Sequence, residues 1–167
     1  MSQKPGGPRN PRRISSVRRW LQSTPRRTFV LYPIAVVAIE AALNDGRIAF
    51  VTWGTPLLVW GYLQYRLCGD YRTRLGGGGP GLDIPPDAII DSGPYRFLRN
   101  PMYMGHLIFM AGLALTFRSW AAVLLLAFHI VWFERRVRAD EAHLERRFGD
   151  AYRRYRARVK RWIPYVY

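Results

Sequence analysis

Three acidic residues in the last third of the chain stand out by their position. Beyond Phe133 the larger apolar residues recur at helical spacing and predict one face of a helix; they are Val137, Leu144, Phe148, Tyr152, Tyr155 and Val159. Glu141 occupies the slot between Val137 and Leu144, where a hydrophobic residue is expected. Glu134 lies earlier on the same face, and Asp140 lies beside it. These acids either pair with nearby arginines, as charges on helices commonly do, or bind a cationic group.

A second polar group precedes an apolar stretch. The segment GPYRFLRNPMYMG, Gly93 to Gly105, contains two arginines, two tyrosines and an asparagine. Pro101 suits the first turn of a helix, where free backbone N–H groups at the positive end of the helix dipole can bind an anionic group such as a carboxylate. With acidic residues opposite, the two segments would present both signs of charge beside apolar walls. That combination suits a zwitterionic cofactor and a lipid-soluble substrate.

Four apolar stretches would position these segments, over 28–43, 48–65, 100–117 and 119–133. As helices they reach about 22 to 27 Å, short of the ~30 Å hydrocarbon core of a bilayer unless they continue into their flanks. Helices of a soluble bundle carry a polar face, and these stretches have almost none. They predict an all-α membrane protein with four short transmembrane helices in two hairpins, followed by a C-terminal cytoplasmic amphipathic helix.

The basic residues predict the orientation of these helices. The net charge is +15, and all of the 26 lysines and arginines except Arg47 and Arg118 lie outside the tight connections of the two hairpins. Because positive charge is enriched on the cytoplasmic side, both termini are expected there. The predicted order is a basic N-terminal segment (1–27), a first transmembrane hairpin (28–65), a cytoplasmic loop (66–99), a second hairpin (100–133) and a cytoplasmic helical tail (134–167). Since the arginines flank the apolar stretches, nucleic acid is not an expected partner.

The two polar segments together match a longer pattern. GPY-x-x-x-R-(H)-P-x-Y-x-G is present as Gly93, Pro94, Tyr95, Arg99, Pro101, Tyr103 and Gly105. After a predicted helical hairpin, E-x-x-L-x-x-x-F-G-x-x-Y-x-x-Y-x-x-x-V with a proline near its end is present as Glu141, Leu144, Phe148, Gly149, Tyr152, Tyr155, Val159 and Pro164. Over roughly Ile89 to Pro164 the chain thus resembles the isoprenylcysteine carboxyl methyltransferase and phospholipid methyltransferase family of integral membrane enzymes. The first two apolar stretches match that family only in being hydrophobic.

This resemblance implies methyl transfer from S-adenosylmethionine to a lipophilic or membrane-embedded acceptor, such as a prenylcysteine-like carboxylate, a phospholipid amine or another small lipid. The cofactor-binding residues that it implies are Asp87, Ala88, Ile89, Ile90, Tyr95, Asn100, Pro101, Met102, Tyr103, Asp140 and Glu141. Arg136 corresponds to a basic position near the substrate, and Arg136 and Glu141 are the residues expected to act in catalysis. Because methyl transfer depends mainly on alignment of the reactants, no metal is expected.

The chain departs from the family pattern at two positions. The histidine that usually follows the arginine is Asn100, and the first of two paired glutamates is Asp140. Asparagine forms hydrogen bonds but does not accept a proton near neutral pH, which excludes an acid–base role at this position. A role in positioning is compatible with asparagine.

Two other functions are compatible with the sequence. One is an NADPH-dependent lipid reductase, because related reductases resemble this helical core. The other is a non-catalytic membrane adaptor whose basic ends bind anionic lipid or an acidic partner. The adaptor leaves the order of aromatic, proline and acidic residues from Gly93 onward without an explanation.

Overall fold

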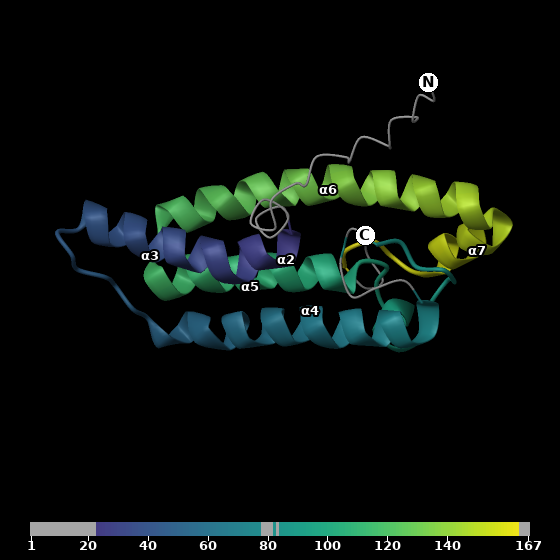
Figure 1. Cartoon of the computed structure of the whole chain (residues 1–167), viewed down its shortest axis with the longest axis horizontal. Coiled ribbons are helices and arrows are strands. Elements are labelled where there is room, and N and C mark those ends of the chain that lie inside the picture. The colour runs from purple at the N-terminus through teal and green to yellow at the C-terminus, as the bar shows by residue number, and fades with distance from the viewer. Residues whose placement is uncertain (1–22, 78–81, 83, 164–167) are drawn as a thin grey trace, which may run out of the picture.

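A computed structural model describes residues 23–77, 82 and 84–163, and these parts of the chain contain helices and no β-strand (Figure 1). The predicted all-helical fold is therefore confirmed. Most of the predicted basic segment 1–27, and Pro164 of the family pattern, lie outside the described residues. None of the helices in the described ranges combines the length and the apolar composition that crossing a membrane requires.

Four long helical runs make up most of the molecule. The first consists of α2 (Thr24–Arg26), a π-helical turn η1 (Arg27–Leu31) and α3 (Tyr32–Leu43). The other three are α4 (Thr55–Gly76), α5 (Pro101–Phe117) and α6 (Trp120–Phe148). The short elements are η2 (Thr52–Gly54) before α4, η3 (Gly93–Arg96) before α5, and α7 (Asp150–Arg158) after α6. Helix α5 contacts α3, α4 and α6, so it is the central helix of the bundle (Figure 1).

Helix α4 differs from its predicted bounds at both ends. Residues 48–51 lie outside any helix, and Val51 has an extended backbone whose N–H donates to the carbonyl of Thr116 at 2.7 Å. The helix then continues past Tyr65 to Gly76, through residues assigned by sequence to a cytoplasmic loop. The reason is local, because the polar residues after Tyr65 include an i,i+4 pair, Arg66 and Asp70, and no helix-breaking proline. Gly77, with φ +67°, ends the helix.

Helix α6 continues without a break from its apolar first half into its charged second half, across the predicted boundary between the second hairpin and the helical tail. Ser119 caps its start by accepting a hydrogen bond from the backbone N–H of Ala122 at 3.2 Å. Gly149, with φ +53°, ends it and starts α7. The left-handed conformation that glycine adopts easily lets the chain turn back at this point, so that α7 packs beside the end of α6 (Figure 1).

Helices α4 and α5 approach each other so closely that their backbones touch. A Cβ atom at Gly61 would lie 2.5 Å from the backbone nitrogen of Phe109, and one at Gly105 would lie 2.7 Å from the carbonyl oxygen of Gly61. At Gly112 it would lie 2.8 Å from the backbone nitrogen of Leu58. Small residues at such a seam allow close helix packing, and they join α4 and α5 into one rigid pair.

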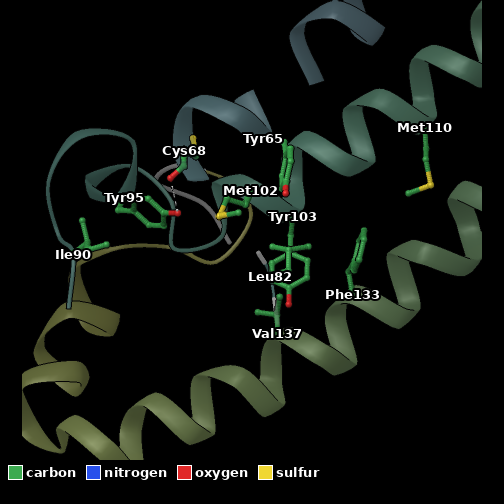
Figure 2. Packing of buried hydrophobic residues seen from close by; sticks show 10 residues of the cluster. All are labelled: Tyr65, Cys68, Leu82, Ile90, Tyr95, Met102, Tyr103, Met110, Phe133 and Val137. Atoms are coloured by element: carbon green, nitrogen blue, oxygen red, sulfur yellow. Dashed lines mark hydrogen bonds between the residues drawn. The ribbon is translucent and has the colours of Figure 1, made fainter. Parts of the chain in front are cut away.

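The buried core extends from the bundle to the segment between α4 and α5 (Figure 2). Phe133 and Val137 of α6 are fully buried, and Met102 of α5 is almost so. Ile90 and Tyr95, which lie outside the long helices, belong to the same cluster. The connection between α4 and α5 is therefore held against the bundle by apolar contacts at its C-terminal end.

Candidate active site

A cavity of about 230 Å³ lies where the second half of α6, helix α7, the start of α5 and residues 84–95 meet. Ile84, Ile89, Ile90 and Leu144 contribute apolar walls. The polar and aromatic residues that line it are Arg72, Tyr95, Arg99, Asn100, Tyr103, Arg136, Asp140, His143, Tyr152 and Tyr155. The cavity therefore combines an apolar wall with charged groups of both signs.

The start of α5 forms one edge of this cavity. Asn100 has a non-helical backbone (φ −125°, ψ 51°), and Pro101 follows in the first turn. The segment before it is fixed by a parallel bridge between Leu98 and Lys160, with the Arg99 backbone N–H donating to the Lys160 carbonyl at 2.9 Å. Backbone N–H groups in the first turn of a helix have no partner within that helix. The edge of the cavity thus carries the positive end of the α5 dipole.

Tyr103 joins two charged residues of α6 at the cavity wall. Its hydroxyl donates a hydrogen bond to Asp140 Oδ2 at 2.7 Å and accepts one from Arg136 Nε at 3.0 Å. The Arg136 guanidinium also lies over the Trp132 ring, 5.8 Å from its centroid. Tyr103 is buried, whereas 44% of the Asp140 side chain is exposed. Asp140 therefore presents an oriented, accessible carboxylate to the cavity.

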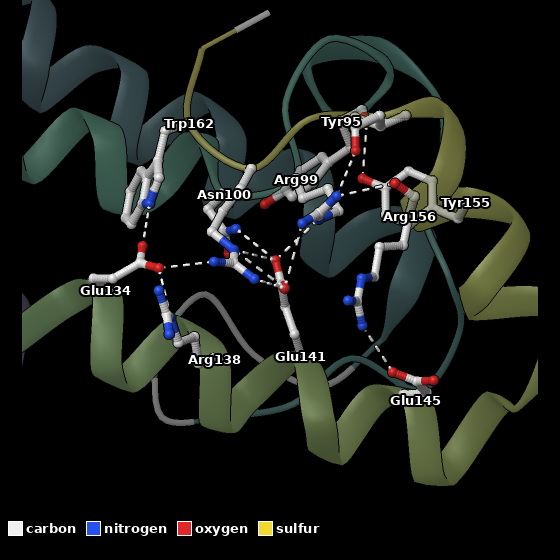
Figure 3. Close-up of polar contacts among 12 residues, drawn as sticks. Tyr95, Arg99, Asn100, Glu134, Arg138, Glu141, Glu145, Tyr155, Arg156 and Trp162 are labelled. Atoms are coloured by element: carbon white, nitrogen blue, oxygen red, sulfur yellow. Dashed lines mark hydrogen bonds and ion pairs between the residues drawn. The ribbon is translucent and has the colours of Figure 1, made fainter. Parts of the chain in front are cut away.

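Glu141 lies next to Asp140 in sequence but is in a different environment (Figure 3). It is 4% exposed and is absent from the cavity lining. Arg99 Nε donates to its Oε1 at 2.9 Å, and Arg161 Nη2 donates to its Oε2 at 2.8 Å. Asn100 Nδ2 donates to Oε1 at 3.3 Å. Glu141, which stands where the helical pattern predicts a hydrophobic residue, is thus surrounded by guanidinium and amide donors.

These contacts determine the charge of Glu141. Burial alone would raise the pKa of its carboxyl group, but hydrogen bonds from Arg161 and Arg99, together with their positive charges, lower the pKa below its usual value. Glu141 is therefore ionised at neutral pH. A carboxylate in this state orients Arg99 and Asn100, two residues that do line the cavity.

Glu134 extends the same network toward the C-terminal end of the described chain (Figure 3). Its Oε1 accepts from Arg161 Nη1 at 2.7 Å and from Arg138 Nε at 2.7 Å, and its Oε2 accepts from the Trp162 indole N–H. Arg161 consequently bridges Glu134 and Glu141, which lie on one face of α6 as the sequence predicted. Through these ion pairs of Arg161, the segment after α7 is held against α6.

Helix α7 is attached to the segment before α5 by a tyrosine. The Tyr155 hydroxyl donates to the backbone carbonyl of Tyr95 at 2.8 Å, and the Tyr95 hydroxyl donates to the carbonyl of Cys68 on α4 at 3.3 Å. Burial raises the pKa of both tyrosine hydroxyls, so both stay protonated and remain donors. Two buried hydrogen bonds therefore connect α7 to the segment before α5, and that segment to α4.

The structure brings most of the residues implied by the family resemblance to this cavity. Those that line it are Ala88, Ile89, Ile90, Tyr95, Asn100, Tyr103, Arg136 and Asp140. The others are placed differently. Asp87 forms an exposed ion pair with Arg147 at 3.1 Å, Pro101 lines a separate groove, Met102 is buried in the core, and Glu141 lies in the ionic network.

Several residues at the cavity were not expected from the sequence. Arg72 reaches it from the part of α4 that was predicted to be a loop, and His143 reaches it from α6. Arg161 and Trp162, which hold Glu134 and Glu141, were also missed. The spacing of Glu134 and Glu141 on one helical face was the available signal, because acids on a face that is otherwise apolar require nearby donors.

Comparisons with known proteins show which family the chain is similar to. The family model described as phospholipid methyltransferase matches residues 50–151, which include α4, α5, α6 and most of the cavity lining. The protein-S-isoprenylcysteine O-methyltransferase of Schizosaccharomyces pombe is 31% identical over 80 residues, which are 47% of this chain and 34% of that protein. This chain therefore spans about a third of that relative's length.

An uncharacterized protein of Haemophilus influenzae is 38% identical over 45 residues, which are 27% of this chain and 68% of that protein. The family match covers more than half of the chain and includes both the glycine seam and the residues around the cavity. The chain belongs to the phospholipid methyltransferase family.

Proposed function

We propose that this protein transfers a methyl group from S-adenosylmethionine to a lipophilic acceptor, in the cavity between α5, α6 and α7. The observation that carries the proposal is the hydrogen-bonded set Arg136, Tyr103 and Asp140 at the wall of a cavity that is otherwise largely apolar. A buried tyrosine that holds the Asp140 carboxylate and the Arg136 guanidinium in fixed positions is well suited to orienting charged reactants.

The residues of the cavity fit S-adenosylmethionine by their chemistry. The Asp140 carboxylate is suited to a cationic group, and Arg72 and the first turn of α5 are suited to a carboxylate. The apolar wall at Ile84, Ile89 and Leu144 is suited to an aromatic base. When bound, S-adenosylmethionine supplies an electrophilic methyl group.

The chain's own residues then contribute orientation. Arg136 is held by Tyr103 and Trp132 and is the basic group proposed to lie beside the acceptor. Glu141 acts indirectly, because it touches Arg99 and Asn100 and not the cavity. Holding the reacting atoms in line reduces the entropy that must be lost in the transition state, and this is the main contribution expected from the protein. The acceptor is a prenylcysteine-like carboxylate, a phospholipid amine or another small lipid.

The proposed site of action is a membrane, with both termini on the cytoplasmic side. Support comes from large apolar side chains that are more than half exposed on three helices: Ile34, Val59, Trp60, Leu124, Phe128 and Val131. Extended apolar surfaces of this kind mark interaction with lipid or with another protein. The second half of α6, helix α7 and the start of α5, which line the cavity, lie at one end of the bundle (Figure 1). An acceptor arriving along the apolar surface would meet the cavity there.

Binding of S-adenosylmethionine to the purified protein in detergent tests the proposal. Asp140→Asn and Tyr103→Phe should each weaken binding by about 10- to 100-fold, since each removes a hydrogen bond to a charged group worth about 1.5 to 3 kcal/mol. Asp150→Asn is the matched control, because Asp150 is an exposed acid outside the cavity and should leave affinity unchanged. NADPH should not bind. Equal affinity in all three variants, or tighter binding of NADPH, would reject the site.

A further inference from the structure

A second concave surface lies between α4 and the segment 94–101. It is a groove of about 580 Å³, and it shares no lining residue with the cavity of the candidate active site. Pro94 and Leu98 form one side of it, and residues of α4 from Trp60 to Arg74 form the other. The groove therefore runs along the outer surface of α4.

Most of this groove is apolar and open to the surroundings. Trp60 is 55% exposed, Leu67 is 61% exposed and Phe97 is 48% exposed, and all three line it. Cys68 forms part of its floor and is buried. Leaving three large side chains exposed in water is unfavourable by about 25 cal/mol for each Å² of apolar surface, so an apolar occupant would stabilise the molecule.

One end of the groove is cationic. Asp70 and Arg74 both line that end, and Asp70 is already paired with Arg66 at 3.9 Å. Arg74 is exposed and forms no ion pair with any residue in the described ranges. An anionic group at this end would therefore meet the exposed guanidinium of Arg74.

The length of the groove also indicates its ligand. Trp60 and Arg74 are separated by about 21 Å along the helix, at 1.5 Å per residue. One leaflet of a bilayer, with its headgroups, is about 20 to 22 Å thick. The cationic end belongs to the same end of the bundle as α7, which is the proposed cytoplasmic end (Figure 1).

We propose that this groove binds one phospholipid with an anionic headgroup, whose acyl chain lies along Trp60 and Leu67 and whose phosphate lies at Arg74. The proposal does not rest on the proposed reaction, because the groove is separate from the cavity. It assigns the outer surface of α4 to a bound lipid.

Cys68 provides a reporter for this site, because it is the only cysteine of the chain and lies in the floor of the groove. The rate at which N-ethylmaleimide alkylates Cys68 would be measured by intact mass, in detergent alone and with added phosphatidylglycerol or phosphatidylcholine of the same acyl chains. Phosphatidylglycerol should slow alkylation at least fivefold, and phosphatidylcholine should slow it less. Denatured protein gives the reference for complete labelling.

Two variants test the role of the headgroup. Arg74→Gln should remove the difference between the two lipids, whereas Arg146→Gln, which changes an exposed arginine outside the groove, should preserve it. Equal protection by both lipids in the unmodified chain would overturn the proposal, as would no protection. Protection that increases with protein concentration in the absence of lipid would instead show that a second copy of the chain covers the groove.

Discussion

At the scale of single residues, the neighbouring acids Asp140 and Glu141 have separate tasks. Asp140 is accessible and faces the cavity, whereas Glu141 is buried and holds Arg99, Asn100 and Arg161. The sequence indicated that both acids matter but could not separate them. The partners of Glu141 lie 42 residues before it and 20 residues after it, and only the tertiary fold brings them together.

This division predicts different effects of two similar substitutions. Glu141→Gln should lower the free energy of unfolding by about 3 kcal/mol, because it leaves the poorly exposed Arg99 guanidinium without its carboxylate and leaves Arg161 paired with Glu134 alone. Glu145→Gln, which removes ion pairs with the exposed Arg153 and Arg156, should cost less than about 1 kcal/mol. Denaturant unfolding in detergent would measure both. Comparable losses in the two variants would contradict the role assigned to Glu141.

At the scale of helices, hydrophobic patterning was a good guide to where helices exist and a poor one to where they end. It predicted the α5–α6 hairpin, because a single charged residue, Arg118, separates the two apolar stretches there. It placed the end of α4 at Tyr65, because charged residues follow. Charge ends a hydrophobic stretch but not a helix, and α4 continues to Gly76.

The glycine seam gives a test at this scale. Gly61→Ala places a methyl group against the backbone of α5, where neither Phe109 nor Gly105 can move without shifting the helix. The substitution should reduce the free energy of unfolding by about 1 to 3 kcal/mol, the usual effect of overpacking. Leu63→Ala changes a 43% exposed residue of the same helix and serves as the control. A Gly61→Ala protein as stable as the control would mean that α4 and α5 separate easily.

At the scale of the whole molecule, the distribution of charge and apolar surface agrees with a bundle that has two unlike ends. Arg47 lies in the connection between α3 and α4, at the end opposite to α7, and most other basic residues lie toward the α7 end or before α3 (Figure 1). This asymmetry could be predicted from the sequence directly, since it depends on counting charges. It could not locate the cavity or the groove, which form only when distant segments pack together.

The proposed orientation can be tested with single cysteines in a Cys68→Ser background. A cysteine introduced as Arg47→Cys should react with a membrane-impermeant maleimide in intact cells, because its connection is expected outside the cytoplasm. A cysteine introduced as Arg146→Cys should react only after the cells are permeabilised. The protein should also stay in the membrane fraction after alkaline carbonate extraction. Equal labelling of the two cysteines in intact cells would contradict this orientation.

The close contact of α4 and α5 has a further consequence. The connection between them leaves α4 at Gly76 and enters α5 at Pro101, so both of its ends are mounted on one rigid body. Its C-terminal part supplies much of the cavity rim. The distance between these two anchor points is therefore constant, whatever side chains the connection carries toward the cavity. Substitution of the connection's apolar lining residues, Ile84 and Ile89, is the direct way to change which molecules the cavity admits.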